Sequence, residues 1–219
     1  MKWSISQLWS KLLFINSPID IELLRPQLPD CFDIDLYQNQ AFISIVPFKM
    51  SQVRFPYTPR LPFSSLWELN LRTYVSYKGK PGIYFFTLDT DHKLAQWIAK
   101  KFFNLPYRYR KLSADVTRNS YDFHAQNSLH LKASIGKDKI KNDLDRWLVE
   151  RYRLFTINQH NEVYQGDVEH SPWQLKEAKI VSLIDKFSVQ FETPLDLANI
   201  SCFYSDSLPV SFKPFKKVS

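Results

Sequence analysis

Glycine is scarce in this chain: only four occur among 219 residues, at Gly79, Gly82, Gly136 and Gly166. No two of them have the spacing of a G-x-G-x-x-G fingerprint or of a P-loop, so both phosphate-binding motifs are absent. Long apolar runs are missing as well, and stretches such as Ala41–Phe48 are far too short to cross a bilayer. These absences exclude the common nucleotide-binding loops and a membrane-spanning helix.

Cysteine is nearly absent too, with only Cys31 and Cys202 in the whole chain. They form no C-x-x-C pair, and the five histidines show no metal-ligand spacing. We expect the two thiols to be free and at least partly buried, as in a protein of a reducing compartment. The first residues also lack the apolar core of a signal peptide. The sequence therefore predicts a cytoplasmic protein with no metal, no cofactor and no membrane partner.

Basic residues outnumber acidic ones by 29 to 22, which gives a net charge of +7. The densest basic stretch is 93–111, which contains Lys100 and Lys101 and no acidic residue. Within it, Tyr107–Arg110 alternates aromatic and basic side chains, a pattern that can stack bases and hold phosphates. On a strand, however, the tyrosines would share one face and the arginines the other, as at a boundary between interior and solvent. Because no nucleic-acid-binding motif accompanies the stretch, nucleic-acid binding is kept as an alternative only.

Aromatic side chains are abundant, with 17 Phe, 11 Tyr and 6 Trp, and such residues favour pleated strands. Periodicity and turn residues predict one domain over residues 1–219, with its core at about 9–212 and a proline-rich loop at Ser51–Ser65. Many short strands and a few helices indicate class α+β, with an antiparallel sheet curled on itself. The predicted helices are Pro18–Leu24, Asp91–Phe103 and Asp143–Val149, and the predicted strands are Phe32–Tyr37, Ala41–Phe48, Trp67–Tyr77, Ile83–Asp89, Tyr107–Arg118, Tyr121–Gln126, Ser128–Ser134, Arg151–Ile157, Glu162–Val168, Ser188–Phe191 and Ser201–Phe212.

The clearest predicted strand, Trp67–Tyr77, has one apolar face and one polar face. Residues two apart on a face lie about 7 Å apart and residues four apart about 13 Å, so Glu68 and Arg72 cannot pair directly. The polar face either meets solvent or lines a polar cavity, and spacing alone favours solvent because antiparallel sheets often expose one side. The polar face consists of Glu68, Asn70, Arg72, Tyr74 and Ser76.

A histidine stands beside a proline turn in the segment Glu169–Trp173. His170 could serve as a general base, since imidazole titrates near neutral pH. It could equally be a hydrogen-bonded structural residue next to an aromatic ring. No G-x-S-x-G segment provides a nucleophilic serine for it to activate.

Seven segments occur in an order and spacing that together are specific, although each alone is weak. They resemble the YqjF-like family of uncharacterised bacterial proteins, and the resemblance extends from about Trp9 to Phe203. No established activity comes with this family. The segments are Leu24–Pro29, Ala41–Met50, Glu68–Val75, Pro81–Asp89, Leu105–Tyr107, Glu150–Tyr152 and His170–Trp173.

The YqjF-like family is similar in fold to acetoacetate decarboxylase. This resemblance implies an antiparallel β-barrel or cone with a few peripheral helices and a ligand pocket inside. In the decarboxylase, a Phe-Gly-x-Pro-Lys-Lys segment supplies a Schiff-base lysine and a cationic neighbour, and the matching stretch here is Phe103–Arg108. Tyr107 holds the lysine position and Arg108 the neighbouring one. Because tyrosine has no amine, decarboxylation through an imine is not expected.

The same resemblance matches the decarboxylase's pocket glutamate to Glu68 and its amino-terminal arginine to Arg25. The strand face that carries Glu68 would then point inward, together with Tyr107 and His170. A buried Glu68 would need a donor or would take up a proton, and Arg25 or Arg72 are the candidate donors.

The sequence thus predicts a barrel that holds a small organic acid or a carbonyl compound, and it leaves catalysis open. If the protein is an enzyme, Glu68 is the acid/base and Tyr107 donates to a developing oxyanion. The alternatives are a non-catalytic interaction module with a closed pocket, and weak nucleic-acid binding through 93–111. The sequence does not indicate an oligomeric state. The candidate ligand-binding residues are Arg25, Asn70, Arg72, Tyr74, Arg108 and His170.

Overall fold

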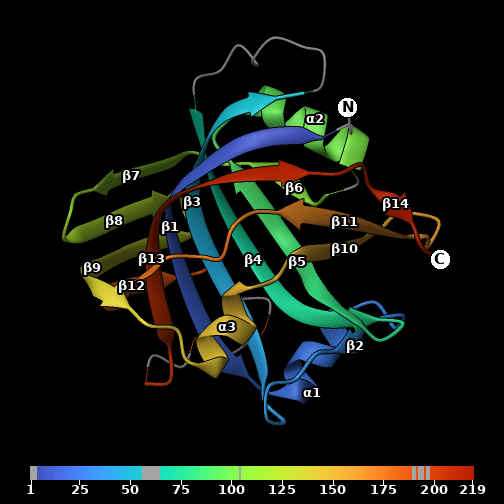
Figure 1. The fold of residues 1–219 in the computed structure, drawn as a ribbon, viewed down its shortest axis with the longest axis horizontal. Helices are drawn as coiled ribbons and strands as arrows, with labels where there is room; N and C mark the ends of the chain where they lie inside the picture. The colour runs from blue at the N-terminus through green and yellow to red at the C-terminus, as the bar shows by residue number, and fades with distance from the viewer. Residues whose placement is uncertain (1–3, 56–64, 104, 189–190, 192–194, 196–197) are drawn as a thin grey trace.

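A computed structural model describes residues 4–55, 65–103, 105–188, 191, 195 and 198–219. Strands dominate it, and a few short helices lie at the periphery (Figure 1). The helical elements are α1 (Ile21–Leu24), the 3-10 turn η1 (Arg25–Gln27), α2 (Lys93–Phe103) and α3 (Asp143–Val149). The strands are β1 (Ile5–Ile19), β2 (Asp33–Ile34), β3 (Ala41–Arg54), β4 (Ser65–Tyr77), β5 (Lys80–Thr90), β6 (Tyr107–Tyr109), β7 (Leu112–Val116), β8 (Ser120–Ala125), β9 (Leu129–Lys139), β10 (Arg153–Ile157), β11 (Val163–Glu169), β12 (Leu175–Asp185), β13 (Ser201–Phe212) and β14 (Lys216–Lys217).

Seven of these strands form a closed path, which we call the ring. Strands β11, β10, β5, β4, β3, β1 and β13 pair in that order, and β13 pairs back onto β11. The pairs are antiparallel except for β5 and β10, which run parallel. Closure leaves these strands few unpaired backbone groups at an edge. The curled sheet expected from the sequence is therefore confirmed, with one parallel pair in its circuit.

A second layer, the outer sheet, continues from β13 through β12, β9 and β8 to β7. It lies to one side of the ring in Figure 1. Alternate residues of β1, β3 and β4 contribute to two separate apolar cores. Leu69 and Leu71, for example, pack with Phe123 and Leu131 of the outer sheet. The other face of the same strands points into the ring, because successive side chains on a strand alternate in direction.

The polar face of β4 is one of these inward faces. Glu68, Asn70, Arg72 and Tyr74 are all buried, with Glu68 and Asn70 each only 3% exposed. The solvent-facing arrangement that spacing alone favours is therefore wrong, because the apolar face is covered by the outer sheet and the polar face by the ring. The inward direction implied by the family resemblance is the observed one.

Several predicted boundaries need correction. The 15-residue strand β1 is missing from the sequence prediction, and its last residues, Pro18 and Ile19, belong to the predicted helix Pro18–Leu24, which begins only at Ile21. The strand expected to end at Phe48 extends to Arg54, whereas the one predicted at Phe32–Tyr37 shrinks to two residues. Strand β12 is missing from the sequence prediction, because charged residues make it look like a loop. The predicted strand Ser188–Phe191 is not observed at its two described residues, because the Phe191 N–H donates to the Ser188 carbonyl oxygen at 3.0 Å, as in a turn. Residues 189–190 and most of the proline-rich loop lie outside the described residues.

Helix α3 begins and ends where the sequence predicts. Asn142 and Asp145 form a capping box, with each side chain accepting from the other residue's backbone N–H. Helix α2 begins at Lys93 and not at the predicted Asp91, whose carboxylate accepts from the Trp67 N–H of β4 at 2.8 Å. His92 Nδ1 accepts from a first-turn N–H of α2 at 3.3 Å. None of the helices in the described part of the chain could cross a bilayer.

Candidate functional site

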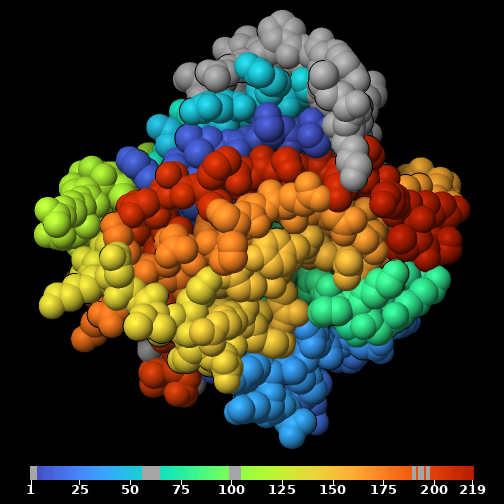
Figure 2. All heavy atoms as spheres, viewed as in Figure 1, coloured from blue at the N-terminus to red at the C-terminus, as the bar shows by residue number. Residues whose placement is uncertain are grey.

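The ring encloses a cavity of about 150 Å³ among its inward side chains. The lower end of the ring in Figure 1 carries α3, and α2 lies at the opposite end. Atoms of α3 and of the segments after it cover this face in the space-filling view, in yellow and orange (Figure 2). The cavity has mostly apolar walls, and a few polar side chains line it.

Two arginines form one end of the cavity. Arg72 is 8% exposed, makes no ion pair with any residue that the structure describes, and its Nε has no hydrogen-bond partner. Its guanidinium carbon lies 5.6 Å from the centre of the Phe14 ring. Burial lowers the pKa of Arg72, but a guanidinium remains charged in proteins. This end of the cavity therefore holds a desolvated positive charge without a counterion.

Arg151 follows α3 and contributes the second guanidinium. Its Nη1 pairs with Asp35 at 2.7 Å and its Nε donates to the Trp147 carbonyl oxygen at 2.6 Å. The guanidinium carbon lies 4.3 Å from the centre of the Trp147 ring. The remaining Nη2 is buried and has no partner. Arg151 is thus held in place by three contacts and keeps one N–H group available.

Asn70 lies between Arg72 and Glu68 along β4. Its amide nitrogen lies 3.4 Å from Glu68 Oε1, and its Oδ1 is buried with no donor. Buried polar atoms without a partner are rare in folded proteins, because each one loses its hydrogen bonds to water. Among the described residues, three of the four buried side-chain atoms of this kind line the one cavity, on Asn70, Arg72 and Arg151.

Glu68 and Tyr107 form a hydrogen-bonded pair further along the cavity. The Tyr107 hydroxyl donates to Glu68 Oε2. Burial raises the pKa of Glu68 from 4.5 to about 7, against the opposing effects of hydrogen bonds from Tyr107 and Asn70 and the charge of Arg72. Burial and the adjacent carboxylate hold the pKa of Tyr107 well above 10. The pair can therefore gain and lose one proton near neutral pH, on Glu68.

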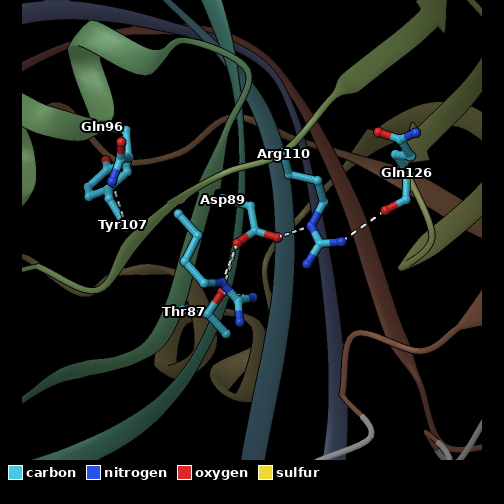
Figure 3. A network of polar contacts seen from close by, with 7 residues as sticks. Thr87, Asp89, Gln96, Tyr107, Arg110 and Gln126 are labelled. Atoms are coloured by element: carbon cyan, nitrogen blue, oxygen red, sulfur yellow. Dashed lines mark hydrogen bonds and ion pairs between the residues drawn. The ribbon is translucent and has the colours of Figure 1, made fainter.

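Strand β6 brings Tyr107 to the cavity, and a buried carboxylate attaches that strand to β5. Asp89 is fully buried and pairs with Arg108 at 2.8 Å and with Arg110 (Figure 3). In the same view Gln96 of α2 approaches the Tyr107 carbonyl oxygen, at 3.5 Å. The predicted division of faces is observed only in part: Tyr107 lines the cavity, but Tyr109 is 44% exposed, and Arg108 and Arg110 pair with the buried Asp89 instead of facing solvent alone.

His170 also lines the cavity, next to the rings of Tyr152 and Trp173 at 4.6 and 4.8 Å. Its Nδ1 lies 2.7 Å from the Ser171 carbonyl oxygen, which can only accept, so Nδ1 carries the proton. Burial lowers the pKa of His170. His170 is therefore a neutral imidazole whose Nε2 is an acceptor.

Aromatic rings form much of the remaining wall. Trp9 stacks on Trp173 at 6.2 Å between ring centres and lies 5.0 Å from Phe48. Phe14 meets the edge of Trp173 at 5.2 Å, and Phe212 lies 5.6 Å from Trp9. The wall offers an apolar surface suited to a flat or bulky apolar group.

Three predicted ligand-binding residues lie elsewhere. Arg25 donates to the carbonyl oxygens of Leu28, Pro29 and Phe32 at 2.6–2.9 Å, so it holds the turn after η1 and does not line the cavity. Arg108 pairs with Asp89 at 2.8 Å and does not line the cavity.

Tyr74 is buried beneath the cavity. Its hydroxyl lies 2.7 Å from Ser44 Oγ and 3.0 Å from the Leu148 carbonyl oxygen. Tyr74 therefore connects β3 and β4 to α3, and Arg25, Tyr74 and Arg108 are not kept as ligand contacts. Of the predicted residues, Glu68, Asn70, Arg72, Tyr107 and His170 line the cavity.

Arg151 and the aromatic wall are absent from the sequence-based candidates. Arg151 belongs to one of the segments that carry the family resemblance, which was the available signal. No lysine lines the cavity among the described residues, so the described part offers no amine for an imine. Nor do the described residues contain a group of three or more His, Cys, Asp or Glu side chains that could hold a metal ion.

Comparisons with known proteins identify the family and the fold of the chain. The DUF2071 family model, described as an uncharacterized conserved protein, matches residues 6–209. The chain is similar to the uncharacterized protein YqjF of Bacillus subtilis, with 36% identity over 227 residues that cover 99% of this chain and 93% of YqjF.

Among solved structures, the chain is similar to acetoacetate decarboxylase from Legionella pneumophila, with a TM-score of 0.70 and 14% identity over 98% of this chain and 87% of the other. It is also similar to the enduracididine biosynthesis enzyme MppR, described as a complex with pyruvate. That match has a TM-score of 0.67 and 10% identity, over 100% of this chain and 91% of MppR. At these identities the likeness establishes the acetoacetate-decarboxylase-like fold.

Proposed function

This chain belongs to the DUF2071 family, together with YqjF, and on that premise we propose that it binds a small organic acid in the ring cavity. The observation that carries the proposal is the buried guanidinium of Arg72, which makes no ion pair with a described residue and whose Nε has no hydrogen-bond partner. An uncompensated buried charge is costly, and an anionic ligand would remove that cost. A planar carboxylate matches the fork of N–H donors that a guanidinium presents.

The Glu68–Tyr107 pair supplies groups that can exchange a proton with the bound acid and donate a hydrogen bond to it. With a pKa of about 7, Glu68 can donate or accept a proton at neutral pH, which suits a general acid or base. Tyr107 can donate its hydroxyl proton to an oxygen on which negative charge develops, in place of its bond to Glu68. A ligand with a carbonyl group besides its carboxylate would allow both roles.

MppR, which has a similar fold and is described as a complex with pyruvate, supports a small carboxylate as the class of ligand. The chemistry must differ from decarboxylation through a Schiff base, because the lysine position is occupied by Tyr107. The cavity argues against the alternative of a closed pocket. Nucleic-acid binding through 93–111 is weakened as well, since Arg108 and Arg110 are both paired with Asp89.

Binding of carboxylates to an Arg72→Met variant tests the proposal. Pyruvate, benzoate and 3-phenylpropanoate are titrated by calorimetry, each against its uncharged amide. We expect at least one carboxylate to bind the wild-type protein while its amide does not, and Arg72→Met to weaken that binding about 30-fold or more, because a charged hydrogen bond is lost. Arg146→Met is the matched control, since Arg146 is exposed on α3 and pairs only with Asp143.

The ligand-free variants give a second readout. Removing the unpaired charge of Arg72 should leave the free energy of unfolding unchanged or raise it, because a buried cation without a partner opposes folding. Equal carboxylate binding by Arg72→Met and wild type, or no binding of any of the three acids, contradicts the proposal.

A further inference from the structure

We infer that the cavity takes a monocarboxylic acid with a hydroxyl group near its carboxylate and an apolar body the size of an aromatic ring. This inference rests on the proposed function and specifies its ligand class. It excludes compact acids that fill only the arginine end. Four features of the cavity support it: the register of its walls, its unpaired atoms, its net charge and its aromatic surface.

The register of the ring places the polar groups at successive levels. Arg72 lies opposite Ser44 of β3, Asn70 opposite Val46, and Glu68 opposite Phe48. Neighbouring levels on one face are about 7 Å apart, so the Cα atoms of Arg72 and Glu68 lie about 13 Å apart. The cavity lining extends along all three levels, so a carboxylate bound at Arg72 leaves the rest of the lining to the body of the ligand.

The unpaired atoms define which groups the ligand carries. Arg72 Nε and Arg151 Nη2 are donors, which an acceptor such as a carboxylate satisfies. Asn70 Oδ1, one level away, is an acceptor and needs a donor. A hydroxyl near the carboxylate supplies that donor without charge, whereas an ammonium would be repelled by the two guanidinium groups.

The net charge limits the ligand to a monoanion. Asp35 neutralises Arg151 at 2.7 Å, so Arg72 is the remaining uncompensated cation of the arginine end. His170 is neutral, and Glu68 is at least partly protonated near pH 7. A dianion such as a phosphate monoester would bring a second charge that no described residue of the cavity balances.

The aromatic wall accounts for the apolar body. Phe48 faces Glu68 across the strand pair, and Trp9, which contacts Phe48, stacks on Trp173. Phe14 joins this wall to the arginine end through its contact with Arg72. A ring attached two or three carbons from the carboxylate would lie against this surface.

Four probes separate the parts of the ligand: 3-phenyllactate has all three groups, lactate lacks the ring, 3-phenylpropanoate lacks the hydroxyl and 2-phenylethanol lacks the carboxylate. Dissociation constants come from calorimetry on the full wild-type chain. We expect 3-phenyllactate to bind tightest, lactate about 50-fold more weakly because of the lost apolar burial, and 3-phenylpropanoate about 10-fold more weakly because Asn70 stays unpaired.

An Asn70→Leu variant tests the hydroxyl contact directly. It should bind 3-phenyllactate and 3-phenylpropanoate equally, since the acceptor that distinguishes them is gone. Lactate binding as tightly as 3-phenyllactate would overturn the inference and leave the proposed function standing. Binding of 2-phenylethanol as tight as that of 3-phenyllactate would instead overturn the proposed function. Preference for the hydroxyl that persists in Asn70→Leu would overturn the role of Asn70.

Discussion

Glu68 shows how one buried residue acquires a property that its type does not have in water. Its carboxyl is buried among mostly apolar walls, and the charge of Arg72 and the hydrogen bonds from Tyr107 and Asn70 oppose the effect of burial only in part. The charged form is therefore penalised, and the pKa rises from 4.5 to about 7. A carboxyl that titrates near neutral pH is unusual outside functional sites.

The raised pKa of Glu68 predicts a pH dependence of stability. Between about pH 4.5 and 7 the unfolded chain releases this proton and the folded protein retains it, so the free energy of unfolding falls as pH rises through that window. The total fall should be about 3 kcal/mol relative to Glu68→Gln, which has no proton to release there. Chemical denaturation of both proteins at pH 4.5 and pH 7.5 measures it. Parallel pH profiles of the two proteins would show that Glu68 titrates normally.

At the scale of an element, β6 is a three-residue strand whose position depends on contacts outside its own backbone. It pairs with β5 over only three residues, and Asp89 of β5 holds Arg108 and Arg110 on either side of Tyr109. Because Tyr107 belongs to the same short strand, the two ion pairs of Asp89 also set where the Tyr107 hydroxyl lies relative to Glu68.

Asp89→Asn should therefore loosen β6. We expect the free energy of unfolding to fall by about 2–3 kcal/mol, because a fully buried, doubly paired carboxylate is replaced by a neutral amide. The backbone N–H of Arg110, which donates to the Thr90 carbonyl oxygen at 2.9 Å, should exchange faster with solvent hydrogen. Denaturation and amide exchange measure these effects.

Asp206→Asn is the matched control for Asp89. Asp206 pairs with Lys176 at 2.6 Å but its side chain is largely exposed, so its loss should cost less than about 1 kcal/mol. If the two substitutions lowered the free energy of unfolding equally, the ion pairs of Asp89 with β6 would contribute no more than an ordinary surface ion pair.

At the scale of the whole molecule, three strands of the ring, β1, β3 and β4, have one face in the core shared with the outer sheet and the other face in the core inside the ring. Tyr121 of β8 connects the layers by a polar contact as well. Its hydroxyl donates toward the carbonyl oxygens of Lys11 and Pro47, at 3.0 and 3.3 Å, beside an irregularity in the pairing of β1 with β3. Tyr121 of the outer sheet thus stabilises the part of the ring where the pairing of β1 with β3 is irregular.

Tyr121→Phe should lower the free energy of unfolding by about 1–2 kcal/mol, because two carbonyl oxygens lose a buried donor. Carboxylate binding in the ring cavity should not change, since Tyr121 belongs to the other core. Tyr109→Phe is the control, because Tyr109 is 44% exposed and its hydroxyl is not needed inside the fold. A Tyr121→Phe protein as stable as the wild type would show that this contact does not join the layers.

The sequence alone determined the class of the fold, most of the strands and five of the polar residues that line the cavity. The alternation of β4 separates Glu68, Asn70 and Arg72 from the apolar face, and that pattern is local. The capping box of α3 is local too, so its bounds were predictable. The order of the segments also pointed to Tyr107, through the family resemblance, and the structure places Tyr107 in the cavity lining.

Only the tertiary structure decided which way the polar face of β4 points, because both faces of that strand are covered by elements distant in sequence. It also decided that Arg25 and Tyr74 bind backbone and neighbouring strands, and that Arg151 lies in the cavity instead. These outcomes depend on long-range pairing and burial, which create charges without partners. Periodicity along one chain segment carries no information about such pairing.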